Sequence, residues 1–192
     1  MDPLTQILMS FGIAAPAGFN AYLALLLVGL GDRFNWISLQ SPYDVLQSTP
    51  VLVGLGVLLS VEVVADKIPA LDSLNDIVGT LVRPASGAFL FAAGNTVLTD
   101  SSPVLSFILG GVSAGTLHAF KAGTRPIWTA TTGGLANPVV SVFEDLFVGT
   151  VVILGMLVPV VAVLVLLTVL AFAVLMVLRL RRGYSRRAHA RR

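Results

Sequence analysis

Residues 60–83 read SVEVVADKIPALDSLNDIVGTLVR, and this polar stretch between two apolar segments decides the fold. Four of the chain's ten carboxylates and two of its twelve basic residues lie in it: Glu62, Asp66, Asp72, Asp76, Lys67 and Arg83. Ionisable groups at membrane depth are costly, so they usually face a bundle interior or an aqueous cavity. Glu62 lies one helical turn deeper than Asp66 and is the leading functional carboxylate. A role at the headgroup boundary, where a charge merely ends a span, fits four of the others as well as a functional role does: Asp66, Lys67, Asp72 and Asp76.

The composition is that of an integral membrane protein. Mean hydropathy is +0.91, and 56% of the 192 residues are hydrophobic while only 11% are charged; soluble domains average about 25% charged residues. A transmembrane helix needs about 20 apolar residues. The sequence therefore predicts an all-α, polytopic helical membrane bundle of about five spans. Some helices are short or broken, with re-entrant segments among them, and the C-terminal helix is long.

The first half of the chain offers three apolar segments. We expect the first span over residues 4–31, broken by Pro16 and Gly18, and a short second span over 51–67. Pro69 should end or bend that helix, because proline lacks a backbone donor. Asp72 can then cap a separate amphipathic helix that lies in the interface and ends at Arg83. A third segment follows over 84–98.

The second half contains a fourth span, a polar interruption and a long apolar run. The fourth span covers 104–119, and Lys121 and Arg125 share a face if its helix persists to Pro126. Residues 129–142 are too polar and broken for an ordinary span and are predicted as a loop. The run over 146–178 exceeds a hydrocarbon core of about 30 Å. It is either one tilted helix bent at Pro159 or a span with a protruding end.

The basic residues are concentrated at the C-terminus. Seven of the twelve lie in the last fourteen positions, which leaves 12 − 7 = 5 against ten carboxylates, a body charge of −5. Directly after an apolar run, such a tail predicts a cytoplasmic anchor on anionic lipids and no nucleic-acid binding. We expect one transmembrane domain over residues 1–180 and a cytoplasmic tail over 181–192. The expected location is the plasma (inner) membrane of a bacterium, multi-pass, and glycine-rich faces permit a homodimer.

Two short patterns recur in the chain. Ser60-Val61-Glu62 is echoed by Ser141-Val142-Phe143-Glu144, and Arg83-Pro84 is echoed by Arg125-Pro126. Many transporters are built from inverted repeats. The spacings differ between the two halves, so an internal repeat stays an open hypothesis.

Several motifs occur together and in order. They are ADKIP (65–69) after Glu62, RPASGA (83–88), KAGTR (121–125) after His118, and NP (137–138) before Ser141 and Glu144-Asp145. This set resembles the bacterial membrane-protein family catalogued as domain of unknown function 4126, over nearly the whole chain from about Gly12. Pro126-Ile127-Trp128 departs from the small residues expected after KAGTR. The resemblance implies a membrane fold and leaves the activity to the residues.

Polar residues in the apolar body are the candidates for ion or solute binding and gating: Asn20, Glu62, Asp66, Lys67, Arg83, His118, Lys121, Arg125, Asn137, Glu144 and Asp145. Because an unpaired charge in the membrane is expensive, we expect the acidic and basic motifs to converge in space. Asn20 also fits a plain hydrogen bond to a neighbouring helix.

These candidates favour a small transporter or channel-like protein for an ion or small solute. A non-catalytic scaffold or lipid-interacting protein is the alternative, in which the polar pairs only fix helix register. A membrane enzyme acting on a lipid phosphate or peptide is less favoured. The sequence has no cysteine, no nucleophile elbow and no paired histidines at metal-ligand spacing. It predicts no catalytic residue, no metal site and no cofactor.

Overall fold

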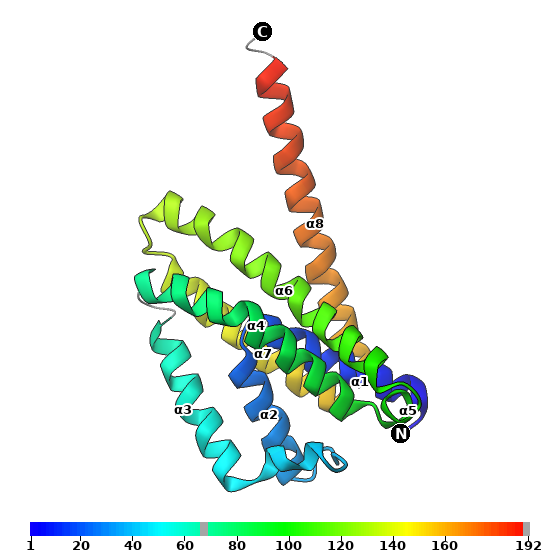
Figure 1. Cartoon of the computed structure of the whole chain (residues 1–192). Coiled ribbons are helices and arrows are strands. Elements are labelled where there is room, and N and C mark those ends of the chain that lie inside the picture. Colours follow the sequence, from blue (N-terminus) through cyan, green and yellow to red (C-terminus); the bar gives the residue numbers. More distant parts are fainter. Residues whose placement is uncertain (66–68, 190–192) are drawn as a thin grey trace.

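The computed structural model describes residues 1–65 and 69–189, with the side chains of 69–76, 173 and 176–189 left outside the description. Over these ranges the chain is all-α, as predicted (Figure 1). The elements are α1 (Pro3–Ala14), η1 (Ala15–Gly18), α2 (Ala21–Arg33), η2 (Tyr43–Gln47), α3 (Thr49–Ala65), α4 (Pro69–Gly94), α5 (Thr96–Ser101), α6 (Pro103–Thr132), α7 (Asn137–Leu157) and α8 (Pro159–His189).

Three described segments are long and apolar enough to cross a membrane: Ile77–Gly94, Pro103–Thr132 and Asn137–Leu157. Two shorter apolar helices accompany them, Thr49–Ala65 and Pro159–Phe172. Many large apolar side chains on these helices point outward instead of into the core, as a lipid-facing surface requires. The chain is a helical membrane protein.

The first apolar segment is broken where Pro16 and Gly18 predicted it. The α-helix ends at Ala14, a 3₁₀ turn covers Ala15–Gly18, and Asn20 is extended with φ −144° and ψ 105°. The Asn20 side chain accepts a hydrogen bond from the Leu23 amide and so caps α2. A Cβ on Gly18 would overlap the Ala114 carbonyl of α6. The break is therefore held directly against the middle of another helix.

Glycines allow the central helices to touch through their backbones. A Cβ on Gly87 of α4 would lie 2.7 Å from the Gly110 carbonyl of α6, and one on Gly110 would collide with the Gly87 carbonyl. A Cβ on Gly12 of α1 would lie 2.8 Å from the Gly155 Cα of α7. This close approach is typical of helix packing in membranes, and it brings α1, α4, α6 and α7 into one bundle (Figure 1).

Two predicted boundaries are wrong because both in-helix prolines are tolerated. The interfacial helix up to Arg83 and the separate segment over 84–98 are replaced by α4, which runs through Pro84 to Gly94. The next break comes at Asn95, whose side chain caps α5. The predicted loop over 129–142 shrinks to residues 133–136, since α6 continues through Pro126 to Thr132 and α7 begins at Asn137. Packing against neighbouring helices compensates for the backbone bonds that proline removes.

The long apolar run is divided into two helices, which neither predicted alternative described. Helix α7 ends at Leu157, Val158 leaves the helical region with φ −140° and ψ 71°, and α8 begins at Pro159. A residue before proline is pushed out of the helical region. Pro159 therefore separates two helices, where only a bend in one helix was expected. Helix α8 then runs back past the bundle, as the orange and red ribbon of Figure 1 shows.

Candidate functional site

A buried ion pair joins α3 to α4. Arg83 Nη2 donates to Glu62 Oε1 at 3.0 Å, and the two side chains are only 1% and 3% exposed. Arg83 lies near the middle of α4, inside the candidate span Ile77–Gly94. Glu62, the carboxylate singled out in the sequence, is therefore desolvated and held by a cation.

His118 of α6 extends this pair. Its Nδ1 lies 2.9 Å from Arg83 Nη1, and its Nε2 lies 3.2 Å from Thr80 Oγ1. A guanidinium nitrogen can only donate, so Nδ1 must be the acceptor. The ring is thus neutral with its proton on Nε2, which donates to Thr80. Protonating Nδ1 would remove the acceptor that receives Arg83.

A second set of charges lies one and two turns further along α6. Lys121 Nζ is 3.1 Å and Arg125 Nη2 is 3.0 Å from the same atom, Oε2 of Glu144 on α7. Lys121 also donates to the Phe19 carbonyl at 2.8 Å, which is the backbone acceptor exposed by the break between α1 and α2. Because His118, Lys121 and Arg125 are spaced by three and four residues, one face of α6 presents all three.

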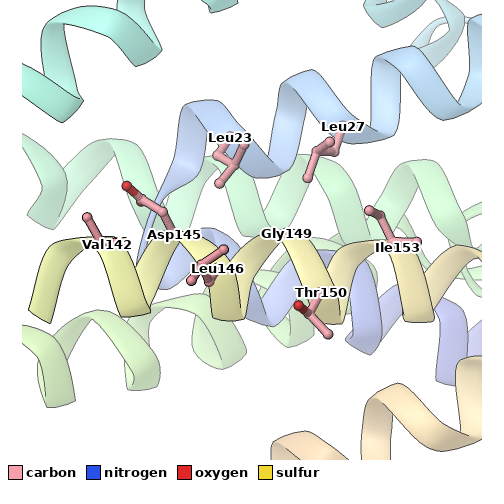
Figure 2. A pocket seen from close by; sticks show the side chains of 8 residues that line it. All are labelled: Leu23, Leu27, Val142, Asp145, Leu146, Gly149, Thr150 and Ile153. Atoms are coloured by element: carbon pink, nitrogen blue, oxygen red, sulfur yellow. The ribbon is translucent and has the colours of Figure 1, made fainter. Parts of the chain in front are cut away.

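The helix break contributes a further polar contact. Asn20 Nδ2 donates to Asp145 Oδ1 at 2.8 Å, while the same side chain caps α2 through its oxygen. The interpretation of Asn20 as a partner for a neighbouring helix is confirmed, since α7 supplies Asp145. In Figure 2 Asp145 extends from α7 toward the start of α2.

We call these eight residues the polar network: Asn20, Glu62, Arg83, His118, Lys121, Arg125, Glu144 and Asp145. It contains three cations, three carboxylates and one neutral imidazole, so its formal charge is zero. The predicted convergence of the two motifs is confirmed in part, because His118 of α6 contacts Arg83, the partner of Glu62. Lys121 and Arg125 take Glu144 as their carboxylate partner.

Adjacent carboxylates open onto two cavities along α7. Asp145 lines a cavity of about 430 Å³ between α2 and α7, with Leu23 and Leu27 on its α2 side (Figure 2). Glu144 lines a cavity of about 510 Å³ formed by α6, α7, α8 and Phe19. Lys121 contacts Glu144 and the carbonyl of Phe19, and the residue after Phe19, Asn20, bonds Asp145.

The remaining candidates are separate from the network or lie outside the description. Asn137 is buried at the start of α7 and bonds Thr129 of α6, with Nδ2 to Oγ1 at 3.0 Å, so it ties the two helices together. Asp66 and Lys67 lie outside the described residues. Sequence reasoning missed the Phe19 carbonyl and the Thr80 hydroxyl. The broken helix around Pro16 was a signal for the first, since such a break exposes backbone acceptors.

The two recurring sequence patterns occupy equivalent contacts. In each case an arginine directly before an in-helix proline pairs with the glutamate of a Ser-Val motif: Arg83 with Glu62, and Arg125 with Glu144. Both distances are 3.0 Å. The order along the chain is reversed between the two pairs. A duplicated segment keeps its residue order along the chain, so these reversed pairs do not support an internal repeat, which stays an open hypothesis.

The broken helices, the apolar exterior and the buried network define a polytopic α-helical membrane protein with charged groups inside its bundle. Residues 7–179 match the family model described as domain of unknown function (DUF4126). The chain belongs to that family, as the motifs around Glu62, Arg83 and Lys121 suggested. Comparison with curated proteins and with solved structures gave no match.

Proposed function

We propose that this protein is a small transporter or channel-like protein that passes an ion or small solute through the bundle. The observation that carries the proposal is the polar network, with Glu144 and Asp145 each bordering a cavity. Ionisable residues inside membrane bundles typically mark ion pathways and relays. A broken helix with exposed backbone groups next to such residues is a common construction of transporter sites.

Lys121 is the central residue of the proposed gate. Its ammonium group contacts Glu144 and the Phe19 carbonyl. Asn20, which follows Phe19 in the chain, donates a hydrogen bond to Asp145. Movement of this one side chain changes the charge balance beside both cavities. A bound ion that takes over one of these contacts would supply the free energy for such a movement.

The proposal is tested with purified protein in liposomes, in which proton, K⁺ and Cl⁻ fluxes are followed in separate experiments. We expect flux of at least one of these ions, and a strong reduction in the variants Glu144→Gln and Lys121→Met. Asp100→Asn is the matched control, because Asp100 is exposed on α5. Equal flux in the control and the two network variants would refute a role for the network.

The scaffold hypothesis predicts a different result. Every charge of the network has an oppositely charged or hydrogen-bonding partner, which also suits a purely structural role. Absence of flux for all three ions, together with retained anionic lipid on the purified protein, would favour that alternative. Retention of lipid is measured by extracting and quantifying the phospholipid that copurifies.

A further inference from the structure

The cavity bordered by Glu144 is built from aromatic rings to an unusual degree. Five of the chain's ten phenylalanines and one of its two tryptophans line it: Phe19, Phe120, Trp128, Phe143, Phe147 and Phe172. One ring is that of Phe19, which follows η1, and the others come from the consecutive helices α6, α7 and α8. Two of them pack edge-to-face on Phe19, with ring centroids 6.4 Å (Phe120) and 5.5 Å (Phe147) from it.

Among the side chains that the structure describes, Glu144 is the charged one that lines this cavity. Its ion pairs with Lys121 and Arg125 both use Oε2, and Oε1 takes no part in them. The two cations lie behind the carboxylate, because Lys121 is 1% exposed and Arg125 is 4% exposed and neither lines the cavity. A ligand in the cavity is therefore surrounded by aromatic and aliphatic side chains, two threonines and Glu144, with both cations in the layer behind the carboxylate.

We infer that this cavity binds a hydrophobic organic cation. Ring faces carry negative electrostatic potential and attract cations, and the attraction increases when the site is desolvated. A volume of about 510 Å³ is within the usual range for small-molecule sites. Phe143 and Phe172 are largely exposed, so the cavity opens on the lipid-facing side, from which an apolar molecule would enter. That the cavity binds such a cation does not depend on the proposed function. That the cation is a transported substrate does rest on it.

Two ions of the same shape and opposite charge test the inference directly. Tetraphenylphosphonium and tetraphenylborate are offered to the purified full chain, and binding is measured by equilibrium dialysis against protein-free micelles. We expect saturable binding of the phosphonium ion with quenching of Trp128 fluorescence, measured in a Trp36→Phe background. Equal or tighter binding of the borate would overturn the inference and assign the cavity to lipid chains or anions.

Variants separate the contributions of charge and rings. Glu144→Gln should weaken binding of the phosphonium ion by about tenfold or more, because a charged contact is lost. Since this change also removes the partner of two cations, Trp128→Leu provides a second test that keeps every charge. It should weaken binding severalfold, whereas Trp36→Leu, which changes a tryptophan outside the cavity, should not.

The fold of each variant is verified by gel filtration and circular dichroism before binding is measured. Unchanged affinity in both folded cavity variants would overturn the inference. Because dialysis requires no flux, failure here is distinguishable from failure of the transport proposal. Binding without transport would retain the site and reject the pathway.

Discussion

Removing one partner of the Glu62–Arg83 pair should cost far more stability than removing both. In Glu62→Leu the guanidinium of Arg83 stays in a site that leaves it 1% exposed. Breaking a buried ion pair in this way costs roughly 3–5 kcal/mol, because an uncompensated charge remains buried. The reverse single change, Arg83→Met, leaves the Glu62 carboxylate buried and should cost a similar amount.

The double variant Glu62→Leu/Arg83→Met should lie within about 1 kcal/mol of the wild type, since apolar replacement of a buried pair is often neutral. The small remaining cost is the hydrogen bond that Arg83 gives to His118. The pairwise coupling is then about 5 kcal/mol or more. Unfolding by sodium dodecyl sulfate in mixed micelles, followed by circular dichroism, measures all four free energies.

Two outcomes would refute the reasoning. Single variants that cost less than about 1 kcal/mol would mean that water already solvates the pair. A double variant whose cost equals the sum of the singles would mean that the two groups do not interact. Asp100→Leu serves as the control for loss of a carboxylate, and as an exposed change it should stay within about 0.5 kcal/mol of the wild type.

Three further predictions concern packing, a terminal cap and orientation. Gly110→Ala should lower the thermal midpoint in detergent by the equivalent of about 1–3 kcal/mol. The control Gly123→Ala on the same helix adds a carbon with nothing within 4 Å of it and should leave the midpoint unchanged. Equal effects of the two changes would contradict backbone contact between α4 and α6. The hydrogen bonds from the Thr5 side chain and amide hold the pKa of Asp2 below its ordinary 3.8. The cap that Asp2 gives α1 is therefore complete above pH 3.8 and is lost as the pH falls through the lower pKa of the folded state. A carbon NMR titration of Asp2 should show the lowered pKa, and Thr5→Val should bring that pKa closer to its ordinary value. A reporter fused after Arg192 should be active in the cytoplasm, and activity only outside would reverse the predicted orientation.

Local signals predicted the helix breaks best. Pro16 and Gly18 sit among small residues, and Asn20 is a strong cap, so the interruption near residue 18 could be read from the sequence. Pro84 and Pro126 carry the same local signal but lie inside helices. Their helices survive because of packing contributed by other parts of the chain, and no local rule contains that information.

The candidate residues could be predicted as a set, but their pairing could not. The cost of isolated charges in a membrane implies that Lys121 and Arg125 have acidic partners. Which carboxylate they reach depends on how α6 crosses α7, and the segment before Glu144 was expected to be a loop. The aromatic cavity was missed for the same reason, because its rings range from Phe19 to Phe172 and no short window contains them.

The zero formal charge of the polar network limits how the network itself responds to membrane voltage. A charge that crosses the whole membrane exchanges about 2.3 kcal/mol with a potential of 100 mV. Three cations that move together with three carboxylates transfer no net charge, whereas movement of Lys121 alone, as in the proposed gate, would transfer one charge. For the transport function proposed above, a voltage dependence would then report movement of Lys121 relative to its partners or of the ion itself.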